Sequence, residues 1–251
     1  RKIPIFSKSL FEKFNICFTQ NIETKNYLKS LGALKIKYIG NLKFAESKNE
    51  KKKNSIKNRK KMFKLKKIWI AASTHYNEEK ICADVHIKLK KKYKNLLTII
   101  IPRHVHRAND IYKEITNLGL KVQLYSKKNK INNDTDIFLV DAYGETKSFF
   151  KISNTVFLGG SLINRGGQNP LEAARFGCKI LYGPNIQNFT EVYRLLDKNN
   201  LSSKFNKPTK LVKLIEESLN KKMNFNNKII KLKKLGSNIL NNTLREINYF
   251  L

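Results

Sequence analysis

VFLGGSLINRGGQNPLE, at residues 156–172, predicts a buried strand that runs through a glycine-rich loop into a helix. Many α/β proteins hold a phosphate or a nucleotide at such a junction, because the loop backbone and the helix start offer N–H donors. Four glycines within nine residues leave one wall of this loop without side chains. The segment GPNIQNF follows at residues 183–189. Together they predict an α/β fold with a site for a phosphate or a nucleotide.

The rest of the chain continues this alternation of strands and helices. We expect strands near residues 68–72, 96–101, 121–125, 136–140, 155–158 and 179–182, and helices near 77–93, 106–118, 145–152, 169–177 and 188–197. Strands that alternate with helices favour a parallel sheet with helices on both faces. Ligands of such sheets bind beyond the carboxyl ends of the strands.

The N-terminal residues predict a smaller β-α-β piece, with a strand at 14–20, a helix at 22–31 and a strand at 35–39. This piece is too small for a domain, so we interpret it as the end of a larger one. The chain does not begin with Met, and we expect it to be a fragment. We divide it into the end of a truncated domain (1–44), a Lys/Asn-rich linker (45–66), a sheet domain (67–225) and a helical tail (226–251) interrupted at Gly236.

The net charge of +32 comes mainly from lysine. The chain has eight arginines and 43 lysines, whereas proteins that read nucleic acids usually use arginine to grip phosphates and guanine edges. Lysine, asparagine and isoleucine all have A/T-rich codons, so we favour a compositional bias. Attraction to an anionic membrane and nucleic-acid binding remain the alternatives, because so basic a surface attracts both.

Other features narrow the class of protein. No run approaches ~18 apolar residues, so we expect no transmembrane helix. The N-terminal segment lacks the apolar core and cleavage site of a signal peptide. Three scattered cysteines predict neither a disulfide framework nor a metal site. A reducing, cytoplasmic setting is the simplest inference.

Polar residues follow the first two expected strands of the sheet domain. Ser73, Thr74 and His75 come first, and the hydroxyls either cap the next helix or contact a polar ligand. Glu78 and Glu79 follow one turn into that helix and favour its positive end. Pro102, Arg103 and His104 follow the next strand, with His106 and Arg107 behind them. Arginine at this place predicts a bidentate grip on a phosphate or carboxylate. We do not expect a metal site, because a third ligand is not evident.

Two further loops complete the cluster. Residues 141–145 contain Gly144, which permits close approach of the backbone to a ligand, and acids that either cap helices or bond sugar hydroxyls. The glycine-rich loop begins with Gly159, Gly160 and Ser161. At its end, Asn169, Pro170 and Glu172 fit the N-cap, N1 and N3 positions of a capping box, so Glu172 is either a cap or a ligand contact.

Taken together, these loops resemble the C-terminal half of the bacterial 3-deoxy-D-manno-octulosonic acid (Kdo) transferases of lipopolysaccharide synthesis. The resemblance covers about residues 1–197. It is carried by LGA…GNLKF at 31–44, AASTH…EE at 71–79, IPRH at 101–104, D-x-x-GE at 141–145, GGSL…GGQNPLE at 159–172 and GPNIQNF at 183–189.

The resemblance implies a GT-B glycosyltransferase, in which two Rossmann-like domains face each other across a cleft. In that family the C-terminal domain binds the donor CMP-Kdo, and the N-terminal domain binds the lipid A precursor and supplies a glutamate as general base. Transfer inverts the anomeric centre and needs no metal or other cofactor. The enzymes lie on the cytoplasmic face of the bacterial inner membrane. The expected partners are therefore CMP-Kdo, a lipid A precursor and an anionic membrane surface, with no specific nucleic acid.

Carried onto this chain, the resemblance assigns two sets of residues. The CMP and donor contacts are Pro102, Arg103, Tyr143, Gly144, Glu145, Asn169, Pro170, Leu171 and Glu172. A second set lines the cleft beside them, namely Ser73, Thr74, His75, His104, Gly159, Gly160 and Ser161. Arg103 would neutralise the phosphate and stabilise the leaving group, and Glu172 would accept hydrogen bonds from ribose hydroxyls.

The chain differs from the family in one residue, and the family's general base is not expected within it. Gln168 stands where the family usually has histidine, so a role that needs a proton there is in doubt. The general base is expected outside this chain, and we expect the chain to bind donor without catalysing transfer alone. A GT-B transferase with another sugar nucleotide, or a basic nucleic-acid-binding module, are the competing interpretations.

Overall fold

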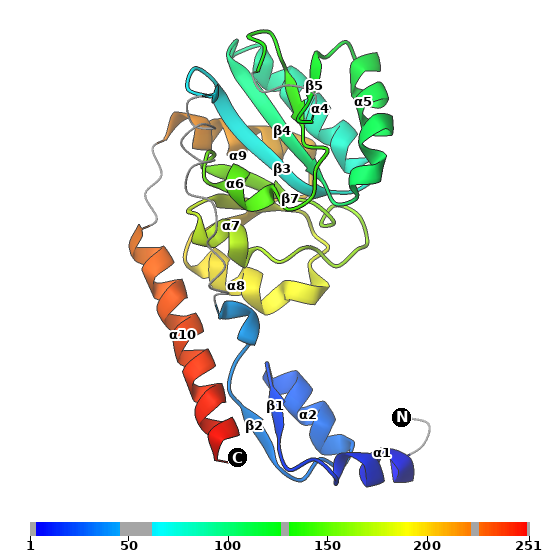
Figure 1. Cartoon of the computed structure of the whole chain (residues 1–251), viewed down its shortest axis with the longest axis vertical. Helices are drawn as coiled ribbons and strands as arrows, with labels where there is room; N and C mark the ends of the chain where they lie inside the picture. The colour runs from blue at the N-terminus through cyan, green and yellow to red at the C-terminus, as the bar shows by residue number, and fades with distance from the viewer. Residues whose placement is uncertain (1–3, 46–61, 127–130, 222–225, 250–251) are drawn as a thin grey trace. The chain divides into compact units, whose positions relative to one another are not determined.

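The computed structural model describes residues 4–45, 62–126, 131–221 and 226–249 (Figure 1). Its contacts divide the chain into two compact units. Unit 1 comprises residues 1–49 and 230–251, and unit 2 comprises residues 50–229. Most of the predicted linker, residues 46–61, lies outside the described part of the chain. The domain boundaries expected from the sequence stay a prediction.

Unit 2 is built on a seven-stranded sheet in which every neighbouring pair is parallel. In spatial order the strands are β5 (Val122–Leu124), β6 (Ile137–Leu139), β4 (Leu96–Pro102), β3 (Lys67–Thr74), β7 (Thr155–Leu158), β8 (Lys179–Tyr182) and β9 (Ser202–Lys204). Six of these strands were predicted, and β9 was not. In the centre of the sheet, Ile70 pairs with Ile99 on one side and Val156 on the other.

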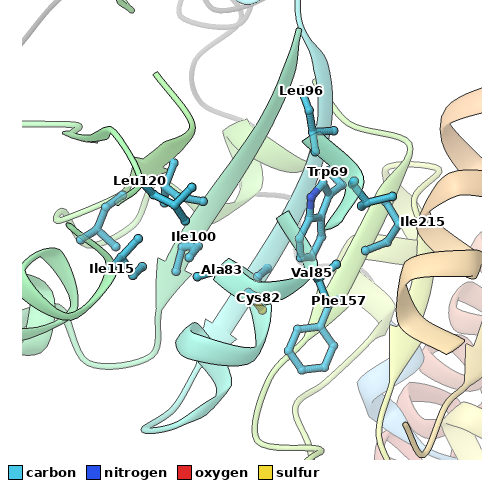
Figure 2. Close-up of a cluster of buried hydrophobic side chains, with 14 of the residues drawn as sticks. Trp69, Cys82, Ala83, Val85, Leu96, Ile100, Ile115, Leu120, Phe157 and Ile215 are labelled. Atoms are coloured by element: carbon cyan, nitrogen blue, oxygen red, sulfur yellow. The ribbon is translucent and has the colours of Figure 1, made fainter. Parts of the chain in front are cut away.

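The central strands are apolar along almost their whole length because both faces of the sheet are covered. On one face, Trp69, Ile100 and Phe157 form a buried cluster with side chains of α4 (Glu78–Lys90), α5 (Ala108–Asn117) and α9 (Pro208–Asn220) (Figure 2). On the other face, Phe138 contacts Phe149 of α6 (Thr146–Phe150), with ring centroids 6.2 Å apart. The predicted covering of both faces by helices is therefore confirmed.

The remaining elements of unit 2 are short turns and helices that follow strands. They are η2 (Val105–Arg107), α7 (Leu171–Arg175), η3 (Gln187–Phe189) and α8 (Thr190–Lys198). The predicted helices of the sheet domain are present, whereas α9 was missed. Leu211, Ile215 and Ser218 of α9 are buried at helical spacing, and Pro208 stands at its start.

Unit 1 contains α1 (Pro4–Phe11), β1 (Cys17–Thr19), α2 (Ile22–Ser30), β2 (Ile36–Tyr38), η1 (Leu42–Phe44) and most of α10 (Asn226–Asn248). The predicted β-α-β piece is confirmed, since β1 pairs with β2 in parallel. The predicted interruption at Gly236 is wrong, because α10 continues through it. A Cβ there would overlap the carbonyl oxygen of Phe44 and lie 2.6 Å from its carbonyl carbon, so glycine lets the helix approach η1.

None of the helices in the described ranges of either unit is long and apolar enough to cross a membrane.

Candidate ligand site at the carboxyl edge of the sheet

Four of the predicted loops leave neighbouring strands of the sheet. The strands β6, β4, β3 and β7 lie side by side, and they lead into residues 141–145, 103–107, 75–77 and 159–170. Because the strands are parallel, all four loops meet at one edge. β3 is the strand of this sheet that comes first in the sequence. It lies between β4 and β7, so the strand order reverses there. Open α/β sheets bind their ligands at such a switch point.

Glu78, at the first position of α4, joins two of these loops. Its side chain is fully buried. Oε2 accepts hydrogen bonds from the backbone N–H of Gly160 at 2.7 Å and of His75 at 3.0 Å, and Oε1 accepts one from Leu162 at 3.0 Å. Burial raises the pKa of Glu78 above its usual value, although the three N–H donors oppose this. The carboxylate thus fixes the backbone of both loops at the switch point.

The sequence predicted only that Glu78 and Glu79 favour the positive end of a helix. The role of Glu78 was missed because its partners come from separate parts of the chain. No local pattern identifies a carboxylate that accepts three such donors.

Glycine is required at positions 159 and 160 for two different structural reasons. A Cβ on Gly159 would lie 2.6 Å from the Cα of Thr74 and 2.7 Å from Glu78 Oε2. Gly160 has a φ of +66°, in the left-handed region that favours glycine. A Cβ there would lie 3.3 Å from Gln168 Nε2 and 3.4 Å from His75 Nε2. The glycines therefore allow the strand ends to touch and keep a side chain out of the space between His75 and Gln168.

The ring of His75 lies in a positively charged neighbourhood. Its centroid is 5.6 Å from that of His104. Burial lowers the pKa of His75, and the electrostatic effects of His104, Arg165, Arg107 and Arg103 lower it further. Among the residues that the structure describes, its buried Nε2 atom has no hydrogen-bond partner. A neutral imidazole with an unused nitrogen is thus held among cations.

The two arginines singled out by the sequence have different surroundings. Arg107 forms a bidentate pair with the fully buried Glu79, at 3.0 and 3.3 Å, so the predicted phosphate grip does not hold for Arg107 in this structure. Arg103 is exposed, and its backbone N–H donates to the carbonyl of Thr74 at 2.9 Å. Arg103 therefore remains the arginine of this pair that is available to an anion. Thr74 itself is fully buried, and its hydroxyl has no partner among the described residues.

The helix that follows the loop at residues 141–145, α6, is connected to the start of α7. Lys147 of α6 pairs with Glu172 of α7 at 3.0 Å. Tyr143 is 73% exposed, and a Cβ on Gly144 would meet nothing within 4 Å. The loop consequently has open space beside it. Asp141 is engaged locally, since it accepts a hydrogen bond from the backbone N–H of Ser126 at 2.8 Å.

The start of α7 differs by one position from the predicted capping box. Asn169 Oδ1 accepts a hydrogen bond from the N–H of Leu171 at 3.1 Å, and the helix itself begins at Leu171. Pro170 and Leu171 are buried. Glu172 is half-exposed and pairs with Lys147, an interaction that the capping interpretation did not include.

Ser161 has a structural role in the glycine-rich loop. Its fully buried hydroxyl donates to the carbonyl of Leu158 at 2.6 Å and accepts the N–H of Gly183 at 2.9 Å. The GPNIQNF segment is thereby tied to the end of β7. All sixteen predicted site residues belong to unit 2.

The structure also has a cavity away from these four loops. A cavity of about 580 Å³ lies at the amino ends of β3 and β7, beyond the opposite edge of the sheet. Five lysines are among its lining residues, namely Lys64, Lys66, Lys67, Lys151 and Lys221. Two of them lie near the carboxyl ends of α6 and α9, where a positive charge stabilises a helix. The carboxyl edge is the candidate site because of its chemistry and its place in the topology.

Within the described ranges, no group of three or more His, Cys, Asp or Glu side chains is arranged to hold a metal ion.

The chain is similar in sequence to curated Kdo transferases. It is 33% identical over 199 residues to the 3-deoxy-D-manno-octulosonic acid transferase of Haemophilus influenzae, a match covering 78% of this chain and 46% of that protein. With the enzyme of the same name from Aquifex aeolicus it is 28% identical over 251 residues, which is 100% of this chain and 65% of that protein. The chain therefore spans less than two thirds of the length of these relatives. No protein-family model matches it.

Solved structures show the same fold. The C-terminal CMP-Kdo binding domain of WaaA from Acinetobacter baumannii is similar with a TM-score of 0.62 at 23% identity, covering 74% of this chain and 97% of that one. Trehalose-6-phosphate synthase OtsA gives a TM-score of 0.50 at 10% identity, covering 93% and 57%. The predicted GT-B type of α/β fold is confirmed, and so is the resemblance to the Kdo transferases.

Proposed function

Because the chain is a relative of the Kdo transferases, we propose that unit 2 binds CMP-Kdo and forms the donor-binding part of a Kdo transferase. The observation that carries this proposal is the position of the four loops, which follow four adjacent strands at the switch point. The likeness of unit 2 to a domain described as CMP-Kdo binding supports the donor class.

The proposed contacts follow from the accessible groups of the site. Arg103 is exposed at the end of β4 and offers two parallel N–H donors to the donor phosphate. The open space beside Gly144 admits the nucleotide against the backbone of residues 143–145. Glu172 accepts hydrogen bonds from ribose hydroxyls with the oxygen that Lys147 leaves free, and Asn169 presents its backbone beside them. Arg103 then stabilises CMP as a leaving group, where negative charge develops during transfer.

We extend the proposal to a whole enzyme of which this chain would form a part. Kdo would pass with inversion, without a metal, to a lipid A precursor, and the general base would come from outside these 251 residues. The enzyme would act at the cytoplasmic face of the bacterial inner membrane, where the net charge of +32 favours an anionic surface. We expect this chain alone to bind donor and not to catalyse transfer.

Calorimetric titration of the purified chain with CMP, in the presence of a chelator, tests the proposal. We expect wild type to bind, and Arg103→Ala to weaken binding by roughly 10- to 100-fold, because a hydrogen bond to a charged group is lost. Lys113→Ala removes the same charge from the exposed surface of α5 and should leave the affinity almost unchanged. Absence of CMP binding by the folded wild type would refute the proposal.

A panel of nucleotides separates the competing interpretations. Preference for CMP over UDP and GDP favours a CMP-linked donor, whereas the reverse order favours a GT-B transferase with another sugar nucleotide. RNA binding that persists at physiological salt, without affinity for CMP, favours a nucleic-acid module, because purely electrostatic binding falls steeply with salt.

A further inference from the structure

The proposed donor carries two negative groups next to each other. In CMP-Kdo the anomeric carbon bears both the phosphate ester and the carboxylate of the sugar. A site that holds the phosphate through Arg103 therefore has to accept a second anion close by. We propose that His75 and Gln168 form a subsite for the carboxylate of the donor sugar. This inference rests on the proposed function.

The two side chains converge on one point of the glycine-rich loop. A Cβ on Gly160 would lie 3.3 Å from Gln168 Nε2 and 3.4 Å from His75 Nε2. Because residue 160 is glycine, no side chain stands between the two nitrogens. The buried Nε2 of His75 has no hydrogen-bond partner among the described residues, and an unsatisfied buried nitrogen is costly. A carboxylate oxygen in front of Gly160, within reach of both nitrogens, would accept hydrogen bonds from both groups.

The backbone that carries both side chains is held in place. Glu78 accepts the N–H groups of His75 and Gly160, at 3.0 and 2.7 Å. The N–H of Gly167 donates to the carbonyl of Gly160 at 3.0 Å, and the hydroxyl of Tyr193 donates to the carbonyl of Gln168 at 3.2 Å. A subsite fixed in this way loses little conformational freedom when it binds.

The subsite lies next to the proposed phosphate partner. The carbonyl of Thr74, one residue before His75, accepts the N–H of Arg103 at 2.9 Å. The loop that carries His75 and the loop that carries Arg103 are thus joined by their backbones. This adjacency fits a ligand whose carboxylate and phosphate share one carbon atom.

The charges that face His75 also favour an anion. His104, Arg165, Arg107 and Arg103 all act on its ring, and burial together with these charges lowers the pKa of the imidazole. The two acids nearby are already engaged. Glu78 accepts three backbone N–H groups, and Glu79 pairs with Arg107. The three arginines that act on His75 therefore outnumber the two carboxylates beside it.

The test compares two ligands on the same protein, CMP and freshly prepared CMP-Kdo, because only the second carries the carboxylate. We expect wild type to bind CMP-Kdo more tightly than CMP. His75→Ala and Gln168→Ala should each reduce this preference roughly tenfold, while the affinity for CMP changes by less than about twofold. Gln20→Ala, an exposed glutamine in unit 1, is the matched control and should keep the preference.

Gln168→Glu distinguishes a carboxylate from a sugar hydroxyl at this point. The added negative charge would repel a carboxylate, so the preference for CMP-Kdo should fall further than in Gln168→Ala. A hydroxyl would donate to the new carboxylate, and the preference would be kept, which would overturn the proposal. The unfolding midpoint of each variant, followed by the fluorescence of Trp69, verifies that the protein is folded.

The two proposals fail in different ways. If wild type binds CMP but the variants weaken CMP and CMP-Kdo equally, the carboxylate subsite is wrong and the proposed donor site stands. If folded wild type binds neither ligand, both proposals are wrong.

Discussion

The two edges of the sheet in unit 2 use charged side chains differently. At the amino edge the charges pair with one another: Asp136 Oδ1 lies 3.0 Å from Lys90 Nζ and 3.4 Å from His86 Nε2. His86 Nδ1 also lies 2.8 Å from the hydroxyl of Thr98. This cluster connects the end of α4 to the starts of β4 and β6, so its role is to hold these elements together.

At the carboxyl edge the buried acids Glu78 and Glu79 hold the loops, and polar atoms are left over. The hydroxyl of Thr74 and Nε2 of His75 are without hydrogen-bond partners in the described part of the chain. Arg103 is exposed beside them. Unsatisfied atoms alone do not distinguish the two edges, because Nε2 of His86 and Nε1 of Trp69 also lack a hydrogen-bond partner among the described residues. The comparison teaches that the carboxyl edge differs in what its buried charge holds: Glu78 accepts backbone N–H groups from two loops, whereas the amino-edge charges join a helix to strands.

The largest expected effect concerns the contact between β3 and the glycine-rich loop. In Gly159→Ala the new methyl group would overlap backbone atoms of Thr74 and the carboxylate of Glu78, so strand ends must move apart. We expect the free energy of unfolding to fall by about 3 kcal/mol. Urea denaturation followed by fluorescence measures this, because Trp69 is the only tryptophan and is fully buried.

Gly119→Ala is the matched control for this prediction. Gly119 has a φ of +80°, but a Cβ there would meet nothing within 4 Å. Only the backbone conformation opposes the methyl group, at a cost of about 1 kcal/mol. Equal losses in both variants would contradict the importance of the close contact at Gly159.

The next effect concerns the acid that organises the carboxyl edge. Glu78→Gln keeps the size of the side chain but turns one of its acceptors into an NH₂ group, which would face a backbone N–H. We expect a loss of about 2 kcal/mol in the free energy of unfolding, together with weaker CMP binding.

The same substitution on the surface provides the reference. Glu216 pairs with the exposed Lys92, and Glu216→Gln should cost about 0.5 kcal/mol or less. A Glu78→Gln variant as stable as Glu216→Gln would show that Glu78 does not hold the loops.

The smallest effect concerns pH at the amino edge. Burial lowers the pKa of His86, although Asp136 opposes this, and Lys90 and Lys66 add to it. Below about pH 6.5 the unfolded chain therefore binds a proton more readily at His86 than the folded chain does. The free energy of unfolding consequently decreases as the pH is lowered. His86→Gln cannot titrate, and between pH 7 and pH 5 it should lose less stability than wild type.

Two features make this measurement specific for His86. The pKa of Asp136 is lowered: burial opposes the shift, but the contacts with His86, Lys121 and Lys90 outweigh it. Its stabilising contribution is lost only below about pH 4, outside the measured window. His106→Gln, at an exposed histidine, should follow the wild-type slope. Parallel pH profiles for wild type and His86→Gln would exclude the proposed linkage.

The sequence predicted the sheet and the loops well because their causes are local. Strands covered on both faces are continuous apolar runs, as at residues 68–72, and the loops carry glycine, proline or arginine where strands end. The predicted order of these segments placed the loops at a common edge. That edge follows from parallel pairing alone, without knowledge of any side-chain contact.

The missed features have causes that are distant in the sequence. Arg107 looked like Arg103, yet a buried carboxylate 28 residues away already occupies it. Gly236 looked like a helix end, because the carbonyl of Phe44 that it accommodates is not visible in the local sequence. Glu78 was seen only as a helix-start charge, since its donors come from both loops.

The close approach of α10 to η1 at Gly236 also bears on the order of synthesis. The two parts of unit 1 are separated by residues 50–229, all of which leave the ribosome between them. At ~5–20 residues per second, the first part waits on the order of ten seconds or more for its partner helix. Unit 2 is continuous in the sequence, so its parts follow one another directly during synthesis, whereas unit 1 needs α10, which is made after nearly all of unit 2.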